Sequence, residues 1–111
     1  MARVLITGCN RGIGAALMTA AKAAGHDPIG TTRDGRGDTI ALTLDRPDTI
    51  DAQLADIGPI DVLINNAGVI GPDRQSPLEM DFAGFAETLN INTLAPLAVA
   101  QAVLPKLRES E

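Results

Sequence analysis

The feature that most limits the fold of this chain is a glycine-rich turn between an apolar run and a helical pattern. Residues 3–7, RVLIT, form a short β-branched run of the kind that is buried in a sheet. The turn TGCNRGIG follows at residues 7–14. Apolar residues then recur at helical spacing from Ile13 to Ala24, with Gly25 as a candidate helix end. A strand that leads directly into a helix in this way predicts an α/β fold.

The rest of the chain continues the alternation of strands and helices. The expected strands are 27–32, 39–44 and 60–65, the expected helices are 48–57 and 80–108, and polar loops separate them at 33–38 and 67–77. The order β-α-β-β-α-β-α predicts one domain with a mainly parallel sheet flanked by helices.

The connection between the second and third strands leaves their pairing open. Only residues 33–38 join the two runs, whereas a helical crossover needs about 10–12 residues or more. Either an extended segment makes the return, or the two strands form a hairpin. We favour a parallel pair, because the run 39–44 is apolar on both faces.

Composition excludes several classes of function. The net charge of −5 argues against a nucleic-acid surface. No apolar run approaches the roughly 18 residues of a membrane span, and the first residues do not read as a signal peptide. A single cysteine, Cys9, cannot form an internal disulfide, so we expect a cytoplasmic protein. The chain contains no Tyr, which closes any mechanism that needs a phenol from this chain alone.

The glycine turn has the properties of a phosphate-binding loop. Backbone N–H groups at a helix N-terminus point outward, together with the positive end of the helix dipole. Gly8 lets the strand end in a tight turn, Gly12 lets the backbone approach a phosphate, and Gly14 permits close contact of helix and strand. The alternative is a glycine turn without a ligand, and the flanking strand and helix favour binding.

Polar residues follow each predicted strand. The carboxyl ends of parallel strands share one edge of a sheet, where ligands bind. We therefore expect Thr7-Gly8, Thr32-Arg33, Leu44-Asp45 and Asn65-Asn66 to lie along one crevice.

These motifs together resemble the short-chain dehydrogenases/reductases, most closely the carbonyl-reductase-like and C-factor-like branch. The matching residues span nearly the whole chain and are Thr7-Gly8-x-x-x-Gly12-Ile13-Gly14, Asp45, Asn65-Asn66-Ala67-Gly68 and Asn92 within LNINTLAP. The resemblance implies a Rossmann-type, doubly wound parallel sheet that binds NAD or NADP. It also implies hydride transfer between the nicotinamide and a carbonyl or alcohol substrate.

The resemblance further implies a role for each matching position. Asn10, Arg11 and Ile13 would hold the cofactor phosphates, and Asp45 would meet the adenine. The segment 66–68, which is Asn66, Ala67 and Gly68, would pass near the adenine-side ribose, and the side chain of Asn65 would brace the central strands.

The end of the second strand indicates NADP rather than NAD. An acidic residue there would bind the ribose hydroxyls and repel a 2′-phosphate. Arg33 occupies this place, with no acid before Asp34, and Arg11 could reach the same phosphate, while Arg36 is a weaker candidate. The alternative is that these arginines are simply solvated.

Asn92 lies inside the long helical pattern, four residues before Pro96. Proline has no N–H, so the carbonyl of Asn92 loses its helical partner and the helix should be distorted there. The resemblance implies that this asparagine positions a water for a proton relay. The alternative is a kinked helix with a satisfied asparagine.

The family's catalytic Ser and Tyr-x-x-x-Lys do not occur in this chain. We therefore expect it to be inactive alone and to be part of a longer sheet, whether by truncation, proteolysis or an early stop. The apolar positions of 80–108 cover most of that helix, which predicts burial on more than one side and contact with a second copy. A nucleotide-binding or interaction module without catalysis is the alternative function.

Overall fold

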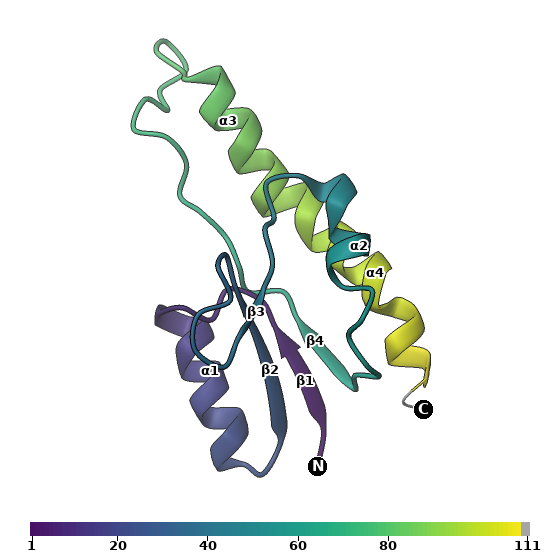
Figure 1. Cartoon of the computed structure of the whole chain (residues 1–111). Coiled ribbons are helices and arrows are strands. Elements are labelled where there is room, and N and C mark those ends of the chain that lie inside the picture. The colour runs from purple at the N-terminus through teal and green to yellow at the C-terminus, as the bar shows by residue number, and fades with distance from the viewer. Residues whose placement is uncertain (110–111) are drawn as a thin grey trace.

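A computed structural model of the chain describes residues 1–109. Its sheet contains β1 (Arg3–Ile6), β2 (Asp27–Thr32), β3 (Ile40–Ala41) and β4 (Val62–Ile64). The helical elements are α1 (Gly12–Ala23), η1 (Pro47–Thr49), α2 (Ile50–Gln53), α3 (Phe82–Leu89), η2 (Asn90–Leu94) and α4 (Ala95–Glu109). Figure 1 shows the sheet with α1 on one side, and a long helical column in which α3 extends beyond the sheet and α4 runs beside β4.

The sheet has the order β3-β2-β1-β4, and all its pairs are parallel. This is the arrangement expected for one half of a Rossmann-type fold, with the change of direction between β1 and β4. The parallel pairing of β2 and β3 is confirmed, but the reason given for it is wrong. Ile40 and Ala41 are exposed, and β3 is a two-residue edge strand rather than one buried on both faces.

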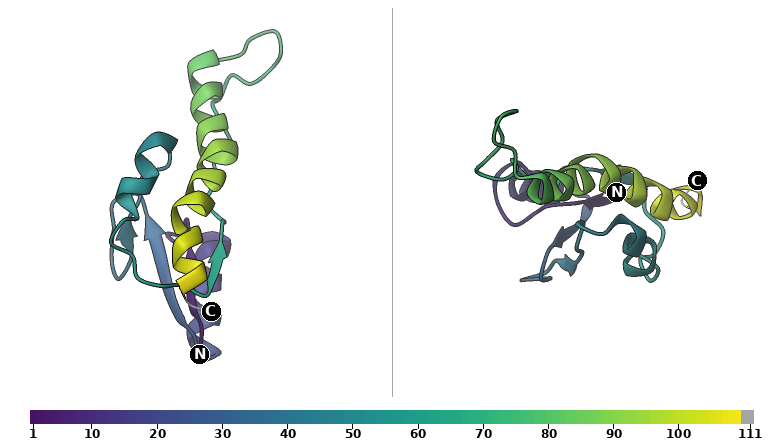
Figure 2. Two further views of the ribbon diagram at one scale, coloured as in Figure 1. Left: turned by 90° about the vertical axis from the view of Figure 1, so that its right-hand side faces the viewer. Right: turned by 90° about the horizontal axis from the view of Figure 1, so that it is seen from above.

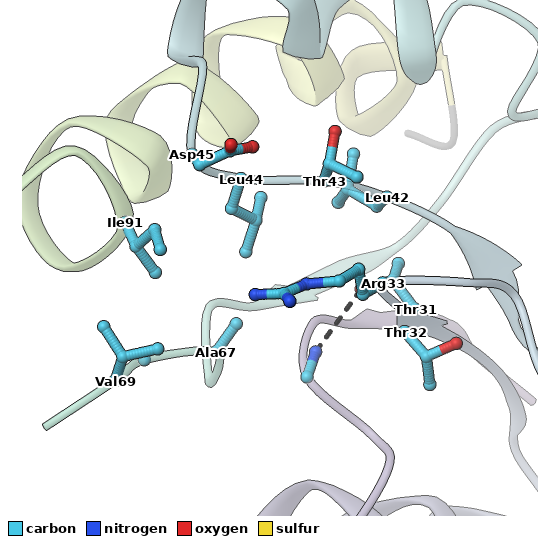
Figure 3. Close-up of a pocket in the computed structure, with 12 residues that line it drawn as sticks. Thr31, Thr32, Arg33, Leu42, Thr43, Leu44, Asp45, Ala67, Val69 and Ile91 are labelled. Atoms are coloured by element: carbon cyan, nitrogen blue, oxygen red, sulfur yellow. Dashed lines mark hydrogen bonds between the residues drawn. The ribbon is translucent and has the colours of Figure 1, made fainter. Parts of the chain in front are cut away.

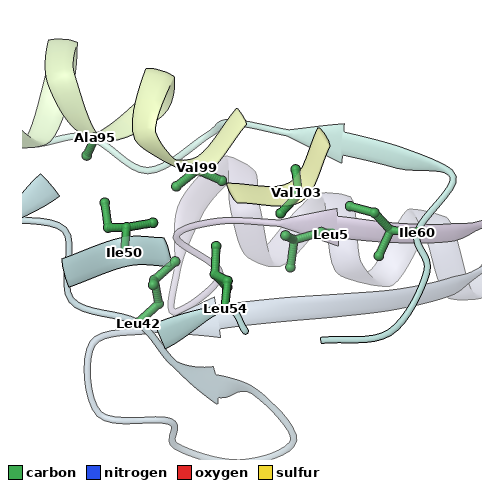
Figure 4. Close-up of a cluster of buried hydrophobic side chains, with 8 residues drawn as sticks. All are labelled: Leu5, Leu42, Ile50, Leu54, Ile60, Ala95, Val99 and Val103. Carbon is green, nitrogen blue, oxygen red and sulfur yellow. The ribbon is translucent and has the colours of Figure 1, made fainter. Parts of the chain in front are cut away.

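Two apolar clusters hold the layers together, one on each face of the sheet. Leu5 of β1 points to one face and joins the cluster under α2 and α4, which also contains Leu42, Ile50, Leu54, Ile60, Ala95, Val99 and Val103 (Figure 4). Val4 and Ile6 point to the opposite face, as the alternation of a strand requires, and pack against Leu17 and Met18 of α1.

The long helix predicted over 80–108 forms, with an irregular section in its middle. Residues Asn90–Leu94 make a π turn, in which the N–H of Ala95 donates to the carbonyl of Asn90. Pro96 follows directly, so the distortion predicted at this proline is confirmed. Figure 2 shows α3 and α4 continuing as one column through the wide turn.

The two ends of this column are buried to different degrees. Ala95, Val99 and Val103 of α4 pack on the sheet, whereas α3 has no buried residue. Phe82 is 77% exposed, and apolar side chains also face outward at Phe85, Leu89, Leu94, Leu97 and Leu104. In this chain the helix is thus buried along one side only, and the expected burial on several sides is not met. The radius of gyration of 14.9 Å exceeds the roughly 13 Å of a compact chain of this length, because α3 extends beyond the sheet.

Two other elements are shorter than predicted, and one of them is β4, which covers Val62–Ile64 of the strand expected over 60–65. The helix expected over 48–57 is reduced to η1 and α2, and a turn follows it before β4. The helix end at Gly25 is confirmed: this glycine has φ +83°, and its N–H donates to the carbonyl of Lys22. Within residues 1–109, no helix is long and apolar enough to cross a bilayer.

Candidate functional site

The glycine turn is fastened to the strands on both sides of β1. Thr7 is 1% exposed, and its hydroxyl oxygen accepts hydrogen bonds from the N–H groups of Asn66 and Ala67, both at 3.1 Å. On the other side, the N–H of Cys9 donates to the carbonyl of Thr31 at 2.9 Å. The turn is therefore held at the switch point of the sheet, between the ends of β2 and β4.

Two of the three glycines allow close packing of the backbone. A Cβ atom at Gly14 would lie 2.0 Å from the carbonyl oxygen of Gly8, so any larger residue would push α1 away from β1. Gly8 itself has φ +72°, and a Cβ there would lie 2.7 Å from the Cα of Ala67. These contacts match the roles that the sequence predicts for both glycines.

Gly12 is different, because open space surrounds it. Its φ is +61°, and a Cβ added to it would meet no atom within 4 Å. Gly12 lines a hollow, here called the turn hollow, together with Gly8, Asn10, Arg11, Asn66, Ala67 and Gly68. A ligand can thus reach the backbone of the turn at this position.

The first turn of α1 has no side chain to satisfy its N–H groups. Arg11 is the N-cap residue, in extended conformation, and its side chain makes no capping hydrogen bond. The first turn also contains no acidic residue. The positive end of the helix dipole therefore opens toward the turn hollow, in the arrangement that binds anions.

A second hollow, here called the strand-end hollow, adjoins the first through Gly8, Ala67 and Gly68. Its walls come from the ends of β1 and β2, the segments 42–45 and 67–69, and Ile91 of η2. Figure 3 shows the Arg33 side chain reaching into it, between Leu44 and Ala67. The strand ends therefore share one crevice, as their order in the sequence predicts.

The crevice contains nearly all of the residues singled out for cofactor binding. Gly8, Asn10, Arg11, Gly12, Asn66, Ala67 and Gly68 line the turn hollow, and Arg33 and Asp45 line the strand-end hollow. Gly14 lies beneath the turn rather than on its surface. Ile13 lines neither hollow, and its side chain is 72% exposed at the start of α1.

The two asparagines after β4 act differently from expectation. The side chain of Asn66 donates to the carbonyls of Thr7 and Gly8, at 3.1 and 3.0 Å, and so fastens β4 to the turn. Asn65 instead donates to the carbonyl of Pro96 at 3.1 Å. Asn66 therefore braces the central strands, which was the role expected of Asn65. Asn65 instead holds the start of α4.

Asn92 uses its side chain to hold the segment that leaves the crevice. Its amide oxygen accepts from the N–H of Val69 at 2.8 Å, and its amide nitrogen donates to the carbonyl of Val69 at 2.7 Å. Both polar atoms thus pair with one residue, as in a strand. The backbone carbonyl of Asn92 receives no hydrogen bond from Pro96, because proline has no N–H.

Comparison with known proteins identifies the family. The family model for short chain dehydrogenases matches residues 43–111, which is more than half of the chain. The chain belongs to the short-chain dehydrogenase family. This confirms the resemblance noted in the sequence and agrees with the Rossmann-type sheet.

Curated relatives of this short-chain dehydrogenase chain extend beyond it. A short-chain dehydrogenase/reductase of Pestalotiopsis microspora is 36% identical over 118 residues, covering 97% of this chain and 43% of the relative. The C-signal protein of Myxococcus xanthus is 52% identical over 52 residues, covering 47% of this chain and 31% of that protein. The chain thus spans less than half the length of these relatives.

Solved structures share the whole fold of the short-chain dehydrogenase chain. A carbonyl reductase from Pseudomonas aeruginosa PAO1 has a TM-score of 0.84 at 27% identity, covering 96% of this chain and 57% of that one. A short-chain dehydrogenase/reductase from Burkholderia multivorans with bound NADP has a TM-score of 0.81 at 27% identity, covering 95% and 53%.

Some residues of the crevice were not predicted from the sequence. Thr31 lines the strand-end hollow, and its hydroxyl accepts from the N–H of Gly8 at 3.3 Å. Val69 and Ile91 also line that hollow. Thr31 could have been predicted, because it lies just before Thr32-Arg33 at the end of the second strand. The contact of Val69 and Ile91 with the same hollow could not, because it depends on how a long loop folds back.

Cys9 lies in the turn but faces inward. It is 8% exposed, and its thiol donates to the carbonyl of Ile6 at 3.0 Å. Burial raises the pKa of this thiol, which disfavours the reactive thiolate. Cys9 therefore acts as a small apolar side chain between β1 and α1, in agreement with the sequence-based interpretation.

Proposed function

We propose that this chain is the cofactor-binding part of a short-chain oxidoreductase that prefers NADP. The whole enzyme would move a hydride between the nicotinamide and a carbonyl or alcohol carbon. The observation that carries the proposal is the open backbone at Gly12, facing a crevice that continues to Arg33. Family membership and the bound NADP of the Burkholderia multivorans protein support it.

The residues present fit a dinucleotide. The free N–H groups at Asn10, Arg11, Gly12 and Ile13 would hold the pyrophosphate, because no side chain caps this helix start. Gly8 and Gly14 would keep the turn tight beneath it. When bound, the cofactor would supply the hydride or accept it.

The adenosine half would lie in the strand-end hollow. Asp45 and Ala67 line the hollow on opposite sides, where the adenine would sit. Asn66 and Gly68 line the adjoining turn hollow and would lie near the ribose. Arg33 extends into this space and could fork onto a 2′-phosphate or stack on the ring. In residues 1–109 the ion pairs are Arg3–Asp27 and Arg36–Asp34, so Arg33 takes part in neither, although Asp45 lines the same hollow.

Asn92 would contribute through its main chain. The oxygen and the nitrogen of its side-chain amide both pair with Val69, so we assign the water-positioning role to its carbonyl, ahead of Pro96. The outward apolar side chains of α3 and α4, among them Phe85 and Leu97, would pack against a second copy of the protein.

A binding module without catalysis is the second candidate. The observation that favours it is the absence of Tyr from the sequence, which removes the usual phenolic acid of this family. We therefore expect this chain alone to bind cofactor without reducing a carbonyl substrate. A downstream reading frame that encodes Tyr-x-x-x-Lys would favour the enzyme, and its absence would favour the module.

Titration calorimetry with NADPH and NADH tests the proposal. We expect NADPH to bind more tightly than NADH. Arg33→Asp should weaken the binding of NADPH by at least about tenfold and that of NADH by less, because the 2′-phosphate would lose its cation. Arg108→Gln, which removes a distant charge from the last turn of α4, is the control. Failure of a folded chain to bind either nucleotide would refute the proposal.

A further inference from the structure

The short return between β2 and β3 contains an ion pair beside the crevice. Asp34 directly follows Arg33, close to the place where an acid selects ribose hydroxyls over a 2′-phosphate. Both carboxylate oxygens of Asp34 are bound by the guanidinium of Arg36: Nε lies 3.1 Å from Oδ1, and Nη2 lies 2.9 Å from Oδ2. Such a two-pronged contact fixes both the position and the charge of the carboxylate.

A separate set of hydrogen bonds holds the loop itself. The Thr32 hydroxyl oxygen accepts from the N–H groups of Gly35 and Arg36, at 2.9 and 3.1 Å. The Thr39 hydroxyl donates its one hydrogen to the carbonyl of Arg36, so the 2.8 Å contact between the two hydroxyls must use the hydrogen of Thr32. The Thr32–Asp34 contact of 3.4 Å is correspondingly long. Arg36 is thus the main partner of the Asp34 side chain, through its guanidinium and also through its backbone N–H, which donates to Oδ1 at 3.3 Å. The bonds of the two threonine hydroxyls hold the loop as well.

The two arginines of this loop face different hollows. Arg33 lines the strand-end hollow, whereas Arg36 lines a separate hollow beside α1, with Met18 and Lys22. The Arg36 guanidinium lowers the pKa of Asp34 to about 2, first through the side-chain hydrogen bonds. An aspartate is charged at neutral pH even at its ordinary pKa. A charged Asp34 next to Arg33 would oppose a 2′-phosphate if nothing neutralised it.

We propose that the Arg36–Asp34 pair determines cofactor selectivity, because Arg36 cancels the negative charge of Asp34 and leaves Arg33 as the effective cation of the crevice. This inference rests on the proposed function and assigns its selectivity to a residue outside the crevice. Arg36 is in this view a positioning residue, which acts on the cofactor through Asp34.

Three variants of the full chain test the proposal by calorimetric titration with NADPH and NADH. We expect Arg36→Gln to weaken the binding of NADPH by about threefold to fivefold, the size of one exposed charge contact. The binding of NADH should stay unchanged or become tighter. Asp34→Asn should leave NADPH binding unchanged or tighter. In the double variant, the ratio of the affinities for NADPH and NADH should return to within about twofold of that of the native chain, because the negative charge of Asp34 is gone.

Arg108→Gln is the matched control, because it removes the same charge far from the crevice and should leave the ratio unchanged. If the double variant stays as weak as Arg36→Gln, Arg36 binds the phosphate itself and the proposal is wrong. A loss of NADPH binding in Asp34→Asn would also overturn it. If the native chain binds both nucleotides but Arg36→Gln leaves their ratio unchanged, this inference fails while the proposed function stands. If the native chain binds neither, both fail.

Discussion

Helices α1 and α3 begin in different ways. At α3, the N-cap residue Asp81 accepts a hydrogen bond from the N–H of Gly84 at 3.0 Å. At α1, the N-cap residue Arg11 offers no acceptor, and its side chain carries a positive charge. The first turn of every helix has N–H groups without a helical partner. In α3 the Asp81 side chain accepts from one of them, whereas in α1 they are left to the solvent or to a ligand.

This difference shows how the chain separates stability from binding. A capping side chain contributes about 1 kcal/mol to a helix, and α1 gives up that contribution. What holds α1 instead is the close contact of Gly14 with Gly8, together with the hydrogen bonds of Asn66 to the turn. The helix cap is absent on the side where an anion would bind. The close packing of Gly14 on Gly8, on the opposite side of the turn, stabilises α1 instead.

Substitution of Gly14 should give the largest effect. Gly14→Ala places a Cβ about 2.0 Å from the Gly8 carbonyl oxygen, and we expect the free energy of unfolding to fall by about 3 kcal/mol or more. Gly12→Ala is the control in the same turn, because only its positive φ is strained, at about 1–2 kcal/mol. Urea denaturation measures both, and equal losses would show that close packing does not hold α1.

A capped α1 should be more stable and bind less well. Arg11→Asp gives the helix an acceptor and a favourable charge, and we expect unfolding to cost about 0.5–1 kcal/mol more. NADPH affinity should fall at least about tenfold, because the carboxylate would compete with phosphate for the same N–H groups. Arg11→Gln removes the charge without adding a strong cap. Undiminished NADPH binding by Arg11→Asp would contradict the interpretation of α1.

Removal of the cap at α3 should have the smallest effect. Asp81→Ala should lower the free energy of unfolding by about 1 kcal/mol, while the affinity for NADPH stays the same. Asp81→Asn, which keeps an acceptor, should retain most of the stability. Thermal unfolding and calorimetry measure the two quantities, and a large loss of affinity would mean that α3 supports the crevice directly.

The regular parts of the fold could be predicted from local pattern. Strand β2 has the expected bounds, and α1 and its end at Gly25 differ from expectation by about one residue, because apolar periodicity and a glycine end are local signals. The third strand was predicted too long. The N–H of Leu42 still donates to the carbonyl of Thr32, but the backbone N–H and carbonyl of Thr43 pair with the side chain of Gln53 and not with a strand.

The crevice was predictable as a set of strand ends but not in its contacts. Parallel order alone brings Gly8, Arg33 and Asp45 together. That the turn is braced by the side chain of Asn66 and not by that of Asn65 was not predictable, because it depends on where α4 starts relative to β4. The pairing of Asn92 with Val69 likewise links residues 23 positions apart across an irregular loop.

The hydrogen bonds of Asn66 to the turn also set an order of events during folding. Asn66 lies 58 residues after Gly8, so the bonds on the β4 side of the turn form only when β4 has reached β1, whereas the bond of Cys9 to Thr31 spans a shorter stretch of chain. Contacts this distant in sequence form late, because a long loop must close before they are made. The proposed nucleotide site would therefore be complete only after the segment around Asn66 has joined the sheet, although most of its glycines come earlier in the chain.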